Sequence, residues 1–431
     1  MPIRSLLLVA LLASSARAGG FGIPEIGVRR TGMASIVGRP DDPSSIYHNP
    51  AGLVLEPGWN LYISMGLAAL DTEFSLAPWD QSNRLLGTTP GANGYYAPVK
   101  PTRAYGVIPM IALTGEILPG KLYLGAAVFV GNAQGAAFAR DAVTHYHLID
   151  GYVIAPQAVV AAAYRLSPTI SLGATAGVIN IRVHGERYVF PIVNGADVSP
   201  VVGTTPQLKL DGSGWAPTWM IGAFGQPTPR ITWGAALTGR VDATLTGPVE
   251  VKYSDDAKVP DTLEGSQTTN QFLPWAFAAG ANFDLTPHVE LGTEFRYWLY
   301  RQYQNQHTDI VGIFLVRSLD TVKDYHDSWE TSGGLRVHDL PAAPKLDLML
   351  GTQYDHSPAP PDTITLDSPS FSHIGLHSGV RYSFGRYRVG ASYIHYWYDV
   401  PTITNSVTSP PTNIQGRGSN NIFTLSLEAR L

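Results

Sequence analysis

Apolar and polar residues alternate along most of the chain beyond residue 58. Between 288 and 300 the apolar side chains share one face of an extended strand: Val289, Leu291, Phe295, Tyr297 and Leu299. The opposite face carries Glu290, Glu294 and Arg296. Similar alternation occurs at 153–166, 345–355 and 374–384. Because successive side chains of a strand point to opposite faces, this pattern predicts β-strands with one apolar and one polar face.

The same pattern, repeated between turn signals, predicts fourteen strands. An even number is typical of a transmembrane barrel, and twelve or sixteen strands stay open because boundaries taken from sequence shift by a few residues. The predicted strands are 59–74, 103–116, 121–131, 151–166, 169–184, 207–225, 229–245, 270–285, 287–302, 320–338, 344–356, 371–384, 386–399 and 419–431.

Two features favour a membrane barrel over a soluble sandwich, which would show the same alternation. Short turns at 166–169, 226–229, 285–287 and 384–386 alternate with long connections near 75–100, 132–150, 185–206, 247–268, 303–320, 356–370 and 400–418. Short turns at one end and long loops at the other are the arrangement of outer-membrane barrels. The chain also ends in an amphipathic strand, 423–431, which resembles the signal that barrel-assembly machinery reads, although it ends in Leu431 and not in Phe.

The N-terminus and the composition agree with export to a membrane. Residues 1–18 combine a basic start, an apolar run at 6–13 and an A-x-A pattern ending at Ala18, which predicts a cleaved signal peptide. Charged residues make up 15% of the chain, against about 25% in soluble proteins. No later segment is apolar for long enough to predict a spanning helix, so a closed β-barrel in the outer membrane of a Gram-negative bacterium is the expected fold.

The segment 19–53 shows neither a helical nor a strand period, yet it has an apolar residue every two to four positions. Disordered segments carry more charge and fewer apolar side chains, so this one is expected to pack against the rest of the protein. A barrel of fourteen strands lies between those that side chains fill and those that leave a channel. We therefore expect residues 19–57 to plug a barrel formed by residues 58–431.

The N-terminal motifs resemble those of a known family. The chain has Gly20-Phe21 near the expected mature start, Thr31-Gly-Met-Ala34, and Ile46-Tyr-His-Asn-Pro-Ala-Gly-Leu53, in which Asn49-Pro50-Ala51 is the most specific mark. These residues resemble the FadL/TodX family of outer-membrane transporters for long-chain fatty acids and other hydrophobic compounds. The resemblance implies a fourteen-stranded barrel closed by an N-terminal hatch. It also implies that ligand leaves sideways through the wall at a kinked strand, for which 121–131 with Gly125 and Gly131 is a candidate.

A hydrophobic ligand needs apolar walls, and a carboxylate on it needs a cation. Candidate ligand-binding residues are Phe21, Ile23 and Ile26 from the hatch and the lumen-facing arginines Arg165, Arg296, Arg336 and Arg381. Alternatively, the arginines pair with Glu290, Glu294 and Asp347 across the lumen. Asn49, Pro50 and Ala51 are candidate gating residues, although an Asn-Pro pair also serves simply to form a turn.

We therefore predict a passive channel for hydrophobic small molecules, with long-chain fatty acids as the first choice of ligand. An aromatic-hydrocarbon channel of the same fold and a general diffusion porin are the alternatives. No motif indicates an enzyme, a cofactor or a metal site. The expected partners are the ligand, outer-membrane lipid with lipopolysaccharide, and barrel-assembly machinery. A net charge of -5 gives no case for nucleic acid, and the resemblance implies a monomer.

Overall fold

The computed structural model describes residues 22–79, 82–193, 196–197, 205–252, 262–313 and 316–431. The predicted signal peptide lies outside these residues. Ten long strands run without interruption: β1 (Trp59–Leu76), β2 (Tyr105–Leu118), β3 (Leu122–Ala137), β4 (Asp150–Ser167), β5 (Ile170–Tyr188), β8 (Gln207–Thr228), β17 (Leu346–Asp355), β18 (His373–Phe384), β19 (Tyr387–Tyr398) and β20 (Ile414–Arg430).

Four further strands of the barrel are each interrupted once. They consist of β9 (Ile231–Thr238) with β10 (Val241–Lys252), β11 (Thr262–Leu273) with β12 (Ala276–Thr286), β13 (Val289–Trp298) with β14 (Asn305–Val311), and β15 (Ser318–Val322) with β16 (Ser328–Val337). The ten continuous and eight partial strands are the eighteen members of one antiparallel sheet. A separate small hairpin contains β6 (Ile192–Val193) and β7 (Ala196–Asp197).

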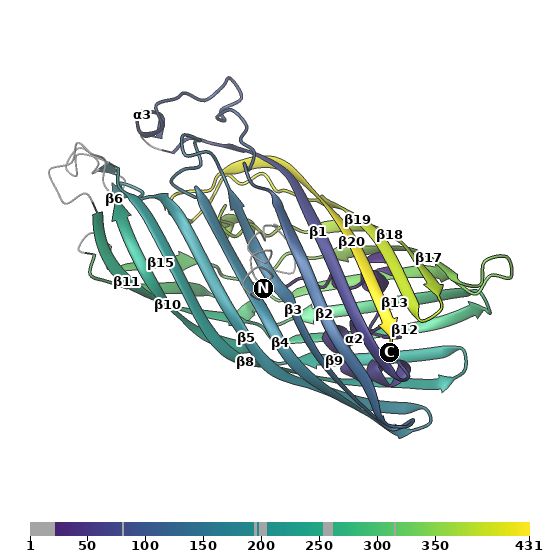
Figure 1. Cartoon of the computed structure of the whole chain (residues 1–431). Helices are drawn as coiled ribbons and strands as arrows, with labels where there is room; N and C mark the ends of the chain where they lie inside the picture. The colour runs from purple at the N-terminus through teal and green to yellow at the C-terminus, as the bar shows by residue number, and fades with distance from the viewer. Residues whose placement is uncertain (1–21, 80–81, 194–195, 198–204, 253–261, 314–315) are drawn as a thin grey trace, which may run out of the picture.

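The sheet closes on itself because β1 pairs with β2 on one side and with β20 on the other. The predicted closed barrel of fourteen antiparallel strands is therefore confirmed. Strand tilt and the long loops at one end are visible in Figure 1. Six strands extend at least four residues beyond their predicted ends: β3 to Ala137, β5 to Tyr188, β10 to Lys252, β11 back to Thr262, β14 to Val311 and β20 back to Ile414. The predicted connections 247–268 and 303–320 are therefore partly strand.

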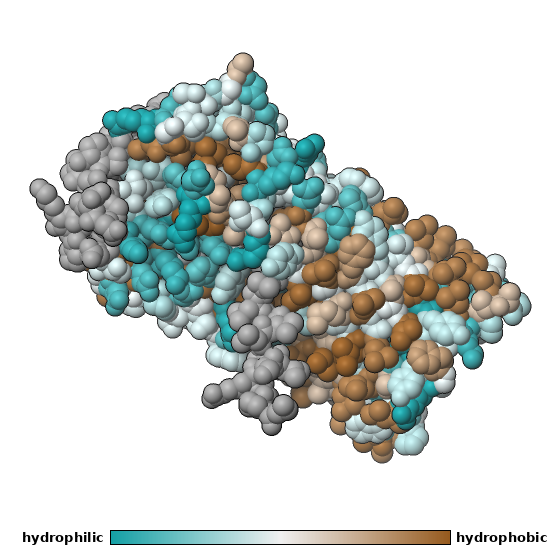
Figure 2. Space-filling view, turned by 45° about the horizontal axis from the view of Figure 1, so that its top comes forward, coloured by the Kyte–Doolittle hydropathy of each residue, from teal (hydrophilic) through white to brown (hydrophobic). Residues whose placement is uncertain are grey.

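The two faces of the strands follow the predicted alternation. In β13, Phe295 is 42% exposed on the outside, whereas Glu290 and Glu294 are buried inside. Apolar side chains gather around the part of the barrel near the short turns, and hydrophilic ones gather near the long loops (Figure 2), as a lipid-facing band requires. Among the described residues, no helix is long and apolar enough to cross a membrane.

Residues 22–57 lie inside the barrel, near the end with the short turns (Figure 1). This N-terminal segment contains α1 (Val28–Met33), α2 (Ser45–His48) and the 3-10 helix η3 (Pro50–Leu55). Helix α1 contacts β16 to β20, and η3 contacts β3, β4, β5 and β8. Short helices elsewhere are α3 (Ser82–Leu86), η4 (Tyr300–Gln302) and η5 (Pro361–Thr363). The segment therefore touches wall strands on both sides of the lumen.

Inward-facing glycines make room for this segment on eight successive wall strands. A Cβ atom added at any of them would lie only 1.9 to 2.8 Å from an atom of the N-terminal segment, closer than van der Waals contact permits. These positions are Gly173, Gly222, Gly234, Gly280, Gly292, Gly334, Gly351 and Gly379. The abundance of glycine in the chain thus has a structural reason: the wall approaches the backbone of the segment at these points.

We predict that Gly234→Val displaces the N-terminal segment, because its Cβ would lie 1.9 Å from the carbonyl oxygen of Val37. The free energy of unfolding in detergent micelles should fall by about 3 kcal/mol, and trypsin should cleave the segment faster. Gly185→Val is the matched control, since the nearest atom to its Cβ is 3.6 Å away on the side chain of Leu210. Equal effects of the two substitutions would contradict the close-packing explanation.

Candidate functional site

Buried ion pairs attach the N-terminal segment to the barrel wall. Arg29 pairs with Glu290 and Arg30 with Glu330, and all four side chains are fully buried. Arg39 binds Asp284 through two hydrogen bonds of 2.7 and 2.9 Å. These acids lie on β12, β13 and β16, so the charges that alternate along the wall strands are matched by arginines of the segment. Removing one partner of such a pair leaves an uncompensated buried charge, which costs about 3–5 kcal/mol.

Backbone groups of the segment are bound to the wall as well. The amide groups of Ile36 and Val37 both donate to Glu294, at 2.7 and 2.8 Å. The candidate gating residue Asn49 donates from Nδ2 to the carbonyl oxygen of Ala223, at 2.9 Å, and its Oδ1 accepts from the amide of Ala51. Pro50 opens η3, and the carbonyl oxygen of Ala51 accepts from Ser171. The triplet thus fixes one turn of the segment against β5 and β8.

The four arginines predicted to bind ligand all have protein partners. Arg165 donates to the carbonyl oxygen of Val54 at 2.7 Å. The other three form the ion pairs that the sequence left as the alternative: Arg296 with Glu294 at 2.7 Å, Arg336 with Glu290 at 3.0 Å, and Arg381 with Asp347 at 2.9 Å. Arg336 also binds Asp41 of the segment at 2.7 Å. Only Arg296 among the four lines one of the cavities described below.

The charge of Asp41 is stabilised by this surrounding of arginines. Burial alone would raise the pKa of its carboxyl group, but Arg29, Arg336 and Arg381 together hold that pKa well below the ordinary value. Asp41 therefore stays ionised across the physiological pH range, and its attraction to the wall arginines persists with it.

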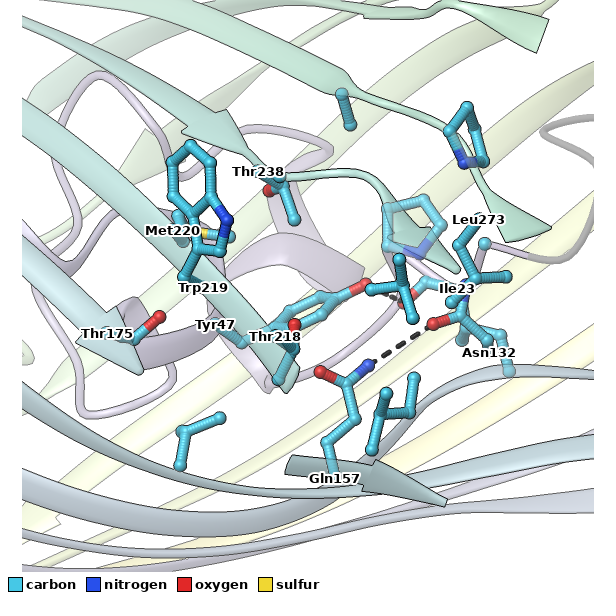
Figure 3. A pocket seen from close by; sticks show the side chains of 18 of the residues that line it. Ile23, Tyr47, Asn132, Gln157, Thr175, Thr218, Trp219, Met220, Thr238 and Leu273 are labelled. Atoms are coloured by element: carbon cyan, nitrogen blue, oxygen red, sulfur yellow. Dashed lines mark hydrogen bonds between the residues drawn. The ribbon is translucent and has the colours of Figure 1, made fainter. Parts of the chain in front are cut away.

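A lower cavity of about 100 Å³ lies between the N-terminal segment and the wall. Its apolar lining includes Ile23 from the segment, Phe129, Val159 and Ile179 from β3 to β5, and Leu273 from β11. Tyr47 reaches into it and donates to the carbonyl oxygen of Ile23 at 2.9 Å (Figure 3). Of the predicted hatch residues, Ile23 lines this cavity and Ile26 is buried in the neighbouring apolar core. Phe21 lies outside the described residues.

An upper cavity of about 140 Å³ lies nearer the long loops and is more polar. It is lined by the same wall strands, with His184 and Arg187 from β5, Leu208 from β8 and Gln271 from β11. Arg187 forms no hydrogen bond or ion pair with any residue that the structure describes, and the charge that it faces is the carboxylate of Asp367, which lines the same cavity. Arg187 was not predicted from the sequence, because its strand was expected to end at residue 184. The inward phase of Ser171, Thr175 and Ile179, extended along the same strand, would have identified it.

The wall is discontinuous beside the lower cavity. The ladder between β2 and β3 ends at Met110 and Phe129, although both strands continue beyond these residues. The register of β3 shifts between Val130 and Asn132, at Gly131. Here the amide of Ile23 donates to the carbonyl oxygen of Gly131 at 2.8 Å, and Gly22 forms an isolated bridge with Asn132. The first described residues of the segment thus bind the free edge of β3 where its pairing with β2 stops.

His48 connects the segment to Arg296 and is held neutral. Its Nε2 lies 2.8 Å from the carbonyl oxygen of Ile26, and its Nδ1 lies 3.1 Å from a guanidinium nitrogen of Arg296. A carbonyl only accepts and a guanidinium only donates, so Nε2 carries the proton and Nδ1 accepts. Burial, reinforced by the charge of Arg296, lowers the pKa of His48 to about 3.

Comparisons with known proteins identify relatives of this arrangement. A family model for outer membrane protein transport proteins (OMPP1/FadL/TodX) matches residues 9–430. The crystal structure of a Pseudomonas aeruginosa FadL homologue is similar, with a TM-score of 0.77 at 14% identity, covering 95% of this chain and 99% of the homologue. The toluene transporter TodX of P. putida has a TM-score of 0.71 at 14% identity, covering 96% and 99%. The toluene transporter TbuX of Ralstonia pickettii has a TM-score of 0.67 at 15% identity, with the same coverage as TodX. No curated protein matches the sequence.

We predict that His48 makes the protein less stable in mild acid. In the unfolded chain His48 has a pKa near 6.5, whereas in the folded protein its pKa is about 3. Between these pH values only the unfolded chain binds the proton, so the stabilising effect of the neutral His48 is complete above pH 6.5 and decreases as the pH falls. When the pH is lowered from 7 to 4.5, the free energy of unfolding of the wild type should decrease by on the order of 2 kcal/mol more than that of His48→Gln. Denaturant titrations measure this difference, with the exposed His326→Gln as control. Parallel pH curves for all three proteins would refute it.

Proposed function

The chain belongs to the OMPP1/FadL/TodX family of outer membrane transport proteins, and we propose that it is a passive channel for long-chain fatty acids. It is a channel of the Gram-negative outer membrane that transports hydrophobic compounds, and its family is not one of enzymes. Beyond this general role, we propose which ligand is transported, which path it takes through the barrel and which residues move to release it. We also propose that it acts as a monomer, because one closed barrel contains every cavity of the route.

The position of Arg187 is the observation that carries the choice of ligand. It forms no hydrogen bond or ion pair with a described residue, and it lines a cavity whose strands also line the apolar cavity below. The charge that faces it is the carboxylate of Asp367, which lines the same cavity and also faces the buried Lys323. An arginine recognises a carboxylate through paired hydrogen bonds, so Arg187 is placed to hold the head group of a fatty acid. The four arginines predicted to bind the ligand instead form hydrogen bonds or ion pairs with protein groups and would keep the N-terminal segment in place; they are Arg165, Arg296, Arg336 and Arg381.

Apolar side chains connect the two cavities and would accommodate the acyl chain. Between Arg187 and the lower cavity, the interior of the barrel is filled by a buried apolar cluster, which would have to separate around the chain and includes Ile181 from β5, Ala216 from β8, Leu245 from β10 and Phe272 from β11. A chain anchored at Arg187 would extend along this surface toward Ile23 and Tyr47. Burial of its methylene groups supplies the driving force, at about 0.8 kcal/mol for each group.

Release requires only the first residues of the N-terminal segment to move. Residues 22–26 bind the free edge of β3 and accept hydrogen bonds from Tyr47, His48 and Tyr396. Residues 29–39, in contrast, are held by the buried ion pairs. We propose that residues 22–26 withdraw from Gly131 and open the wall between β2 and β3, so that the ligand leaves into the membrane. Asn49, Pro50 and Ala51 contribute to gating by fixing the part of the segment against which these residues move.

A monoaromatic hydrocarbon is the second candidate ligand. The lower cavity holds about 100 Å³, less than the apolar cavity of about 150 Å³ that binds benzene, so a ring would have to displace part of the lining. Such a ligand would fill the lower cavity alone and would have no use for Arg187. A general diffusion porin is the third candidate, and it would admit polar solutes past the N-terminal segment.

Uptake by cells that lack their own transporter tests these candidates. We predict that Arg187→Ala reduces the uptake of labelled oleate several-fold, because the carboxylate loses its cation, while the uptake of toluene is unchanged. Arg182→Ala is the matched control, since Arg182 lies on the same strand but faces outward. Oleate uptake insensitive to Arg187 together with rapid toluene uptake would favour the aromatic ligand. Free passage of sugars without either ligand would favour the porin.

A further inference from the structure

Four neighbouring strands of the barrel are interrupted in succession. The interruptions separate β9 from β10 at 239–240, β11 from β12 at 274–275, β13 from β14 at 299–304 and β15 from β16 at 323–327. The ladders continue on either side of these interruptions. On the side of the short turns Thr238 of β9 pairs with Ala276 of β12, and on the side of the long loops Val241 of β10 pairs with Leu273 of β11. The discontinuity is therefore shared between strands, and its nearest part, between β8 and β9, is separated from the β2–β3 edge by the four strands β3, β4, β5 and β8.

The interruption is widest between β8 and the strand formed by β9 and β10. The ladder from β9 ends at Met220 of β8, and the ladder from β10 begins at Ser213, so residues 214–219 have no ladder partner on that side. One backbone hydrogen bond crosses here, from the amide of Gly239 to the carbonyl oxygen of Trp219 at 3.0 Å. The carbonyl oxygen of Gly214 is satisfied instead by the side chain of Asn180 on β5, at 3.1 Å.

Unpaired backbone is costly in a lipid-facing wall and is tolerated where it borders a cavity. The lower cavity does reach this place, since Met220, Thr238, Gly239, Val241 and Pro274 all line it. Figure 3 shows Trp219, Met220 and Thr238 on one side of the cavity and Ile23 with Asn132 on the other. The cavity thus borders two discontinuities of the wall on opposite sides.

An aromatic side chain covers the second discontinuity from outside. Trp219 lies on the outer face of β8, and its indole ring occupies the space above Gly239, where an added Cβ would lie 2.3 Å from a ring atom. Trp275 packs edge-on against it, with ring centroids 5.4 Å apart. Because Gly239 has no side chain, the indole of Trp219 covers the backbone at this point of the cavity lining.

We propose that this interruption is a second lateral portal, which connects the lower cavity to the lipid phase and is closed at rest by Trp219 lying over Gly239. The proposal rests on the proposed function, because the molecule that crosses is the apolar part of the same ligand. Aromatic and aliphatic groups line the passage, so it suits an acyl chain or a ring. Rotation of one indole ring away from Gly239 is enough to open it, whereas the exit at β3 requires the backbone of residues 22–26 to move.

Closing the first exit isolates the second. The chain contains no cysteine, so Gly22→Cys with Asn132→Cys introduces a single pair at an antiparallel bridge, where Cα atoms are near enough for a disulfide. In the oxidised double variant we expect part of the oleate or toluene uptake to remain. Adding Trp219→Ala should raise this remaining uptake several-fold. Trp215→Ala is the matched control, a lipid-facing tryptophan on the same strand that does not line the cavity.

Each outcome decides the proposal. Remaining uptake that increases with Trp219→Ala, and not with Trp215→Ala, supports the second portal. Uptake that falls to the level of empty cells and is not restored by Trp219→Ala overturns it and leaves the proposed function intact. Remaining uptake that is insensitive to Trp219 also overturns it, because the ligand then leaves elsewhere.

A measurement without transport tests the portal even if the proposed function fails. Met220 faces inward at the lower cavity, so Met220→Cys in purified protein reports access from the lipid. An alkyl maleimide dissolved in lipid vesicles should modify this cysteine several-fold faster after Trp219→Ala than after Trp215→Ala. Equal rates in the two variants would overturn the portal whatever the transported ligand is.

Discussion

The structure depends on the close packing of residues 22–57 against the inner wall. A barrel of fourteen strands encloses more space than its own inward side chains fill, and large side chains along the wall would not leave room for a second backbone. On eight successive strands an inward-facing glycine provides the space that the backbone of the segment needs. The approach is so close that backbone carbonyls and amides of the segment meet the wall directly, as where Met33 passes Gly334 and Gly351. The lumen is therefore filled by backbone as much as by side chains.

Such packing brings charged groups of the segment and the wall together without water. Arg29 and Arg30 have no exposed side-chain surface, and neither do their partners Glu290 and Glu330. Burying these charges is costly, and their mutual attraction repays the cost only while the pairs stay intact. This explains why the charged faces of the wall strands do not form a polar channel. They hold the segment, and Arg187, the cation proposed to bind the ligand, lies nearer the long loops at the upper cavity.

Much of the fold could be predicted from the sequence, because strand alternation is a local property. The closed barrel, its fourteen strands and the inward position of Glu290 and Glu294 follow from residue spacing. The pairing of the charges was foreseen only in part: Glu290, Glu294 and Asp347 were expected as partners of the wall arginines, but not of Arg29 or of the Ile36 amide. Such contacts join residues more than 250 positions apart, and no local pattern specifies them. Arg187 was missed for a simpler reason, since the end of its strand was placed too early.

The distribution of contacts also determines which parts of the molecule are free to move. Withdrawal of residues 29–39 would expose several buried charges at once, each worth several kcal/mol, so this part of the segment acts as a rigid floor. Residues 22–26 form backbone hydrogen bonds at the edge of β3. They also accept side-chain hydrogen bonds of 2.8 to 2.9 Å from Tyr47, His48 and Tyr396. A hydrogen bond contributes only about 1 kcal/mol net, so separating a few of them is within reach of ligand binding. Strand pairing stops at two places that border the lower cavity, between β2 and β3 and between β8 and the strand of β9 and β10. Fewer ladder hydrogen bonds hold the wall together there, so less backbone pairing would have to break for either place to open.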